Sequence, residues 1–212
     1  MPTLTPDWDG YVGAGTSDWG TLMTADSGKT FNHILEAAPG AIKVSANSNN
    51  TLHFKNEVFL EFGALNSLTL ITSAKLYIYL ANVTSGMEIR GVKGTFTNNT
   101  SNNFNDFEID EDYFTATTIT NGWNAITLNS DAILALSGAS AFKIFLVEEF
   151  VHTSAGNSND PPDANYSKSA TFYFSEHTSF SPYIDYTTPT PSSGTIKLNS
   201  GLAQLTSGKI TL

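Results

Sequence analysis

The chain has 212 residues, of which 40% are apolar and 12% aromatic, so it can form the core of one large β domain. Twenty acidic residues against ten basic residues give a net charge of -10, which repels the phosphates of nucleic acids and the surface of anionic membranes. Because cysteine is absent, a disulfide framework, a thiolate nucleophile and a cysteine-based zinc site are excluded. We therefore expect no nucleic-acid partner and no membrane partner.

The N-terminus and the surface composition bear on localisation. Residues 1–7 have neither the basic region nor the apolar region of a secretory signal. The longest strongly apolar run, residues 141–147, is far shorter than the roughly 20 residues that cross a bilayer as a helix. Only 14% of the residues are charged, so Asn, Ser and Thr supply much of the polar surface, as in many extracellular and virion proteins. This composition without a signal predicts release by lysis and a virion location, with an extracellular location as the alternative.

Alternation of apolar and polar residues, interrupted by turn residues, predicts a succession of short strands. The clearest strand is residues 74–80, whose even-numbered residues are apolar and face a core, while Lys75, Tyr77 and Tyr79 face the other way. The other predicted strands are residues 9–12, 58–62, 87–93, 114–119, 123–128, 141–147, 171–174 and 183–186.

One short segment, residues 130–136, has a helical pattern, with Ser130 or Asp131 as its N-cap and a stop near Gly138. Many short strands and a single short helix predict an all-β fold, namely an antiparallel two-sheet jelly-roll sandwich. We assign residues 1–187 to this sandwich.

The composition changes after the sandwich. Residues 188–193 are rich in Pro, Thr and Ser, which predicts an extended linker. Residues 194–212 then contain a seven-residue repeat whose units begin at Gly194, Gly201 and Gly208 and have apolar residues at the third and fifth positions. Each unit predicts a short strand with one apolar edge, and Gly and Ser form the turns.

Three such strands cannot bury their apolar edges alone, so they predict an assembly arm that lies against the sandwich or against another subunit. The alternative is a tail that folds back on its own domain. The residues expected to form the arm interface are Ile196, Leu198, Leu202, Leu205, Ile210 and Leu212.

Several segments between Pro6 and Tyr186 resemble the DNRLRE-type and related jelly-roll modules of extracellular bacterial proteins and of tail-fibre or structural proteins of tailed phages. The matching segments are residues 9–12 with Trp19, 58–62, 70–79, 123–128, 174–176 and 181–186. The tail units are similar to the short Gly-x-Ile-x-Leu segments of many tailed-phage virion proteins. Together these resemblances imply a virion module with a β-sandwich body.

No motif of a known catalytic or metal site is present. The four histidines are scattered without ligand spacing, and the sequence has no serine-nucleophile elbow, phosphate-binding loop or zinc-protease motif. Glu148 and Glu149 are neighbours on a predicted strand, so they point to opposite faces and are poorly placed to act together as a glycosidase pair. We therefore expect that the protein is not an enzyme.

One acidic run is a candidate for Ca²⁺, the only cofactor that the sequence brings into consideration. In an extended chain, Asp106, Glu108, Asp110 and Asp112 share one side and present hard oxygen ligands. The alternative is a solvated sheet edge whose negative charge prevents pairing with another edge.

Aromatic residues outside the predicted core are candidates for ligand binding. Tyr77 and Tyr79 face away from the core side of their strand, whereas Trp8, Trp19 and Tyr113 lie near predicted loops. Flat rings of this kind stack on sugars or anchor protein interfaces. The alternative is that these rings fill a second layer or the rim of the sandwich.

These observations favour a non-enzymatic structural virion protein of a tailed phage, such as a tail-fibre, decoration or capsid-attached subunit. Its expected partners are other virion proteins and further copies of itself, which it contacts through the C-terminal arm. The alternative function is a carbohydrate-binding module or adhesin domain that recognises cell-surface glycans.

Overall fold

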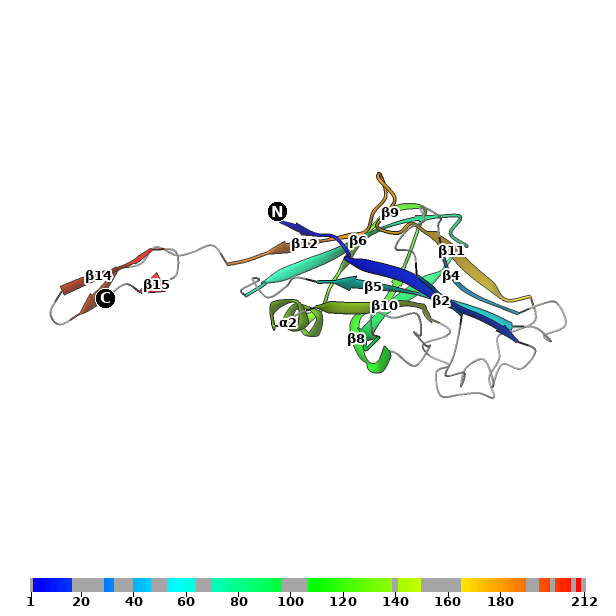
Figure 1. Ribbon diagram of the computed structural model, residues 1–212, viewed down its shortest axis with the longest axis horizontal. Helices are drawn as coiled ribbons and strands as arrows, with labels where there is room; N and C mark the ends of the chain where they lie inside the picture. Colours follow the sequence, from blue (N-terminus) through cyan, green and yellow to red (C-terminus); the bar gives the residue numbers. More distant parts are fainter. Residues whose placement is uncertain are drawn as a thin grey trace.

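Short antiparallel strands make up nearly all of the regular secondary structure in the computed structural model of the chain (Figure 1). The structure describes residues 2–16, 29–32, 40–46, 53–63, 70–96, 107–138, 141–149, 165–189, 195–198, 201–206 and 209–210. The elements of the body are β1 (Thr3–Leu4), β2 (Trp8–Thr16), β3 (Lys29–Asn32), β4 (Gly40–Ala46), β5 (His53–Phe62), β6 (Ser73–Ala81), β7 (Glu88–Gly94), β8 (Phe107–Thr118), β9 (Gly122–Thr127), α2 (Ser130–Gly138), β10 (Phe142–Glu148), β11 (Ser167–Phe172) and β12 (Tyr183–Thr187). No helix in this described part of the chain has the length and apolar character needed to span a membrane.

The body is a sandwich of two antiparallel five-stranded sheets, which confirms the predicted fold class. The first sheet contains β1, β12, β6, β9 and β11, and the second contains β2, β5, β10, β7 and β8. In the first sheet β12 and β11 pair with one edge of β6, and β9 pairs with the other edge. β4 joins the two sheets because it pairs with both β11 and β5, and β3 extends the second sheet beside β2. The consecutive strands β5, β6 and β7 lie in alternate sheets, as in a jelly-roll winding.

The main core lies between the facing sides of the two sheets. Ala74, Leu76, Ile78 and Leu80 of β6 are all buried in it, which confirms the alternation predicted for this strand. They pack with alternate residues of the opposite sheet, among them Leu60 of β5. Burial of each such aliphatic side chain contributes about 1.5–3 kcal/mol to folding, so this inner layer is the main stabilising element of the body.

The second sheet is buried on its outer face as well. Trp8, Phe59, Phe96 and Phe145 belong to a second buried cluster, in which the ring of Trp8 lies 4.7 Å from that of Phe59 and 5.5 Å from that of Phe96. The expectation that Trp8 is an accessible ring near a loop is therefore wrong, since Trp8 is 5% exposed. Because both faces of β5 are covered, its residues 58–60 are apolar without alternation.

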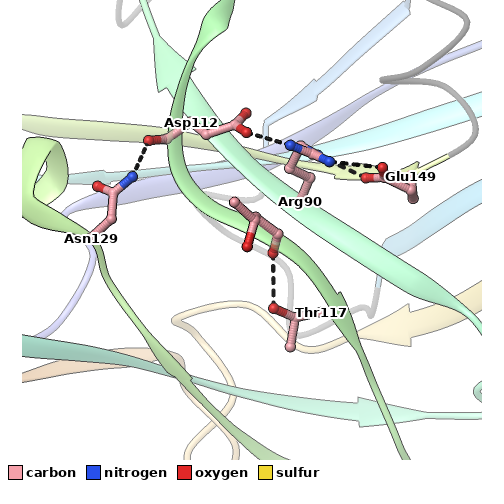
Figure 2. Close-up of polar contacts among 6 residues, drawn as sticks. Arg90, Asp112, Thr117, Asn129 and Glu149 are labelled. Carbon is pink, nitrogen blue, oxygen red and sulfur yellow. Dashed lines mark hydrogen bonds and ion pairs between the residues drawn. The ribbon is translucent and has the colours of Figure 1, made fainter.

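The predicted helix is present as α2, but its cap differs from the prediction. Asn129, rather than Ser130 or Asp131, caps it: its Oδ1 accepts hydrogen bonds from the backbone N–H groups of Asp131 at 3.1 Å and Ala132 at 3.0 Å. The Nδ2 of Asn129 donates to the backbone carbonyl of Asp112 on β8 at 2.5 Å (Figure 2). One side chain therefore both starts the helix and ties it to the second sheet.

The tail forms three short strands, β13 (Thr195–Leu198), β14 (Gly201–Thr206) and β15 (Lys209–Ile210), of which the structure describes the backbone. β14 pairs antiparallel with β13 and with β15, so each repeat unit supplies one strand, as predicted. In Figure 1 this small sheet lies beyond the end of β12, apart from the sandwich. Leu212 and most of the predicted linker lie outside the described residues.

Replacement of Asn129 by Ala removes both capping hydrogen bonds and the link to β8. We expect the free energy of unfolding, measured by urea denaturation, to fall by about 1–2 kcal/mol. Asn129→Asp is the matched control, since its carboxylate still caps the helix but cannot donate to the carbonyl of Asp112. The decrease in its free energy of unfolding should be intermediate. An Asn129→Ala protein as stable as the wild type would contradict the role given to this cap.

Candidate functional site

β12, β6 and β9 are neighbouring strands of the first sheet (Figure 1). Their aromatic side chains form a continuous patch on the outer face of that sheet. Tyr77 of β6 lies opposite Tyr183 of β12, and the two rings stack in parallel at 4.7 Å. Trp123 of β9 lies opposite Tyr79 of β6, with the ring centroids 5.6 Å apart, and its ring also meets that of Tyr183 edge-on at 5.6 Å. The three strands bring these rings together because alternate residues of each strand project from the same face.

A groove crosses this patch. Its volume is about 440 Å³, and its lining residues are Thr3, Thr5, Trp123, Thr178, Ser179, Ser181, Tyr183 and Asp185. A second hollow, of about 220 Å³, is lined by Ser73, Ala74, Lys75, Tyr77, Asp185, Tyr186 and Thr187. Asp185 belongs to both hollows, so they adjoin each other. Trp123 remains 45% exposed in the groove, which therefore combines an accessible ring with many hydroxyl groups and a carboxylate.

Tyr77 and Tyr79, predicted as ligand-binding residues, have different surroundings. Tyr77 lines the smaller hollow. Tyr79 lies beneath Phe180, whose ring stacks on it at 3.8 Å, and the ring of Tyr173 meets it edge-on at 5.5 Å. Tyr79 is therefore packed among other rings. This agrees with the alternative that the aromatic residues fill a second layer.

Tyr113, predicted as a ligand-binding residue, lies apart from the groove and is mostly buried. Its side chain is 4% exposed, and its ring stacks on that of Phe142 at 4.7 Å within the core. The neighbouring Phe114 is buried too, because the pairing of β8 with β7 shifts here and breaks the simple alternation of faces. The fourth predicted residue, Trp19, lies outside the described residues.

Two aromatic groove residues were missed by sequence reasoning although the strands that carry them were predicted. Trp123 and Tyr183 each alternate with buried residues, Ile126 on β9 and Ile184 on β12, so strand parity alone places their rings on the outer face. No comparable signal exists for Thr5, which reaches the groove from another part of the chain.

The acidic run in β8 lacks the regular geometry on which the Ca²⁺ prediction rested. Val92 and Lys93 are adjacent on β7, but they pair with Asp112 and Glu108, which are not adjacent on β8. The extra residues of β8 form a β-bulge. A bulge changes which side chains of a strand share a face.

The described member of the acidic run, Asp112, forms an ion pair with Arg90 (Figure 2). Asp106 lies outside the described residues, as do the side chains of Glu108 and Asp110, so Ca²⁺ binding by these three stays a prediction. Among the side chains that the structure describes, no group of three or more His, Asp or Glu is placed to hold a metal ion.

Arg90 links three strands on the outer face of the second sheet. Its Nε and Nη2 donate to the two carboxylate oxygens of Glu149 at 2.7 and 2.8 Å, and its Nη1 donates to Asp112 (Figure 2). The hydrogen bonds that Arg90 donates to Glu149 and Asp112 hold its pKa above the usual range. The bidentate contact with Glu149 and the ion pair with Asp112 hold the end of β10 against β7 and β8.

Glu148 and Glu149 have separate partners. The hydroxyl of Tyr166 donates to Glu148 at 2.9 Å, and Glu148 is 3% exposed, whereas Glu149 is bound by Arg90. Burial and the neighbouring Glu148 raise the pKa of Tyr166, so its hydroxyl stays protonated as a donor. These contacts give no support to a glycosidase pair at this position.

Two buried carboxyl groups away from the groove have raised pKa values. Asp9, at 1% exposure, accepts the backbone N–H of Ser175 at 2.8 Å, and burial together with the charge of Glu176 raises its pKa to about 7. Glu57 is fully buried 3.7 Å from Lys55; burial raises the pKa of Glu57 to about 7 and lowers that of Lys55. Both carboxyl groups make the stability of the body depend on pH.

No family model matches the chain, and no curated protein matches it either. The sequence also lacks the Asp-Asn-Arg-Leu-Arg-Glu string for which the DNRLRE-type modules are named. The structure supports one implication of that resemblance, the two-sheet antiparallel β-sandwich.

Arg90→Ala leaves the carboxylates of Asp112 and Glu149 close together without their cation. We expect the free energy of unfolding at pH 7, measured in urea, to fall by about 1–2 kcal/mol, because these groups are largely shielded from solvent. Arg90→Lys keeps the charge but loses the bidentate contact with Glu149, so its free energy of unfolding should decrease less than that of Arg90→Ala. Unchanged stability of Arg90→Ala would show that the network is not stabilising.

The raised pKa of Asp9 predicts a defined pH dependence of stability. The unfolded chain releases this proton near pH 3.8, but the folded protein retains it up to about pH 7, so the contribution of Asp9 to the free energy of unfolding falls between these values. Asp9→Asn keeps an acceptor for Ser175 without the buried charge, and we expect it to raise stability at pH 8 by roughly 1–3 kcal/mol. At pH 4 the two proteins should be nearly equal, and a gain of the same size at both pH values would contradict this explanation.

Proposed function

We propose that this protein is a non-enzymatic structural subunit of a tailed-phage virion, such as a tail-fibre, decoration or capsid-attached protein. In this proposal the sandwich is the displayed body, and the tail strands β13, β14 and β15 assemble with neighbouring subunits. The tail carries the proposal, because among the described strands β13, β14 and β15 pair only with one another and add no strand to the sheets of the body.

The register of the tail supports a sheet with one apolar face. Ile196 pairs with Ala203, and Leu205 pairs with Ile210. Ala203 and Leu205 are two residues apart on β14, so all four positions belong to the same face of the small sheet. A single layer of three short strands has nothing of its own to cover that face, and stable sheets require a second packed layer.

Leu202 is the exception among the described residues that were expected in the arm interface. It pairs with Lys197, so its position belongs to the opposite face of the small sheet. The free edges of β13 and β15 also carry backbone groups that can pair with a strand of another subunit. Other virion proteins and further copies of this chain are therefore the partners that the tail fits.

The described part of the body supports a structural role rather than catalysis. The two carboxyl groups with raised pKa values, Asp9 and Glu57, do not line the groove, and Glu149 is held by Arg90. Several charged groups of the second sheet form ion pairs that tie strands together. The alternative function, a carbohydrate-binding module or adhesin domain, is favoured by one observation, the groove on the first sheet.

Deletion of residues 194–212 tests the assembly role. We expect the full chain to form oligomers or to bind virion partners and the shortened chain to be a folded monomer, as measured by light scattering and circular dichroism. Leu205→Asp should mimic the deletion because it places a charge on the apolar face, whereas Gln204→Asp, on the same strand but the opposite face, should not.

A full chain that is monomeric and incorporates into no particle would overturn the assembly role. The virion location has its own test, because antibodies against the sandwich should label phage particles in electron micrographs. Particles without label would overturn that part of the proposal.

A further inference from the structure

We propose that the groove on the outer face of the first sheet binds a neutral saccharide chain, with Trp123 as the platform on which one sugar ring stacks. This inference concerns the body and not the tail, so it goes beyond the assembly role and does not depend on it. Three features of the groove carry it: the arrangement of the rings, the polar groups of the lining, and the distribution of charge.

The rings of the groove are held in place before any ligand binds. Tyr183 is fixed by its parallel stack on Tyr77, and the ring of Trp123 is braced edge-on by Tyr183 and Tyr79. Although braced, Trp123 keeps 45% of its surface exposed. The C–H groups on one side of a pyranose ring pack well on the electron-rich face of an indole ring, and a ring that is already immobile loses little entropy in doing so.

The polar lining consists mostly of hydroxyl groups. Thr3 and Thr5 of the N-terminal segment line the groove together with Thr178, Ser179 and Ser181. Each hydroxyl is both a donor and an acceptor, as are the hydroxyls of a sugar. Few other ligands require rings and several such groups on one surface, so the lining fits a polyhydroxylated ligand.

Asp185 occupies a central place in this lining because it belongs to both hollows. A carboxylate accepts hydrogen bonds from two adjacent hydroxyls at once, which is a contact that orients a sugar ring. With about 440 Å³, the larger hollow falls in the usual range of ligand pockets, roughly 300–1,000 Å³, and the adjoining hollow of about 220 Å³ provides space for continuation of the chain.

The charges of the groove favour a neutral ligand. Lys75 pairs in register with Asp185 across β6 and β12, so the one cation of the lining stands beside a carboxylate. The chain as a whole carries a charge of -10, which repels sulfated or uronic-acid chains. An anionic polysaccharide would therefore meet a carboxylate in the groove and a repulsive field around it.

The test is isothermal titration calorimetry of the full chain with a panel of neutral hexasaccharides built from glucose, mannose, galactose or N-acetylglucosamine, and with a heparin hexasaccharide. We expect saturable binding of at least one neutral member and none of the heparin fragment. Trp123→Ala should weaken that binding at least tenfold, and Asp185→Asn should weaken it less. Leu134→Ala is the control, since Leu134 is an exposed apolar residue on α2 that does not line the groove.

A second variant avoids any effect on the aromatic packing. Thr5→Arg places a bulky side chain in the groove from an exposed position and should abolish binding while the thermal unfolding of the protein stays the same. Absence of binding by every neutral member, preference for the heparin fragment, or equal affinities of the wild type, Trp123→Ala and Thr5→Arg would each overturn the inference. None of these outcomes affects the assembly role, which is read from the tail.

Discussion

The pleat of β6 connects the core of the sandwich with the groove on its surface. Its even-numbered residues are buried between the sheets, while Tyr77 and Tyr79 lie on the outer face beside the rings of β9 and β12. Successive side chains of a strand point to opposite faces of the sheet. The packing that fixes the register of β6 therefore also fixes the positions of the surface rings. A shift by one residue would bury the tyrosines and expose the aliphatic side chains, so the core enforces the geometry of the groove.

The second sheet shows a different solution, because both of its faces are covered. Phe59 and Phe145 form an outer layer with Trp8, while Leu60 and Ile144 face the main core. Charged side chains on this sheet must then be paired or neutralised, as Lys55 and Glu57 are. The chain has few charged residues, and several of those on this sheet join strands, so hydroxyl and amide groups supply much of the polar surface.

Local pattern predicted the strands and the helix well, since periodicity depends only on neighbouring residues. Residues 74–80 and 130–136 illustrate this, as both form the elements expected of them. Prediction failed where the backbone departs from regular pairing. The bulges of β8 bury Tyr113, an effect that has no signal in composition or spacing. The groove was missed as a whole because its lining comes from Thr3, Trp123, Thr178 and Asp185, which only the tertiary fold brings together.

The repeat of the tail has a consequence for how such a protein changes over time. Each seven-residue unit yields one strand, and β14 pairs with its neighbours in the same antiparallel way on both sides. Duplication or loss of one unit therefore adds or removes a single rung without disturbing the pairing of the others. The reach of the appendage can be adjusted in fixed increments by small in-frame duplications, while the gene region that encodes the body stays as it is.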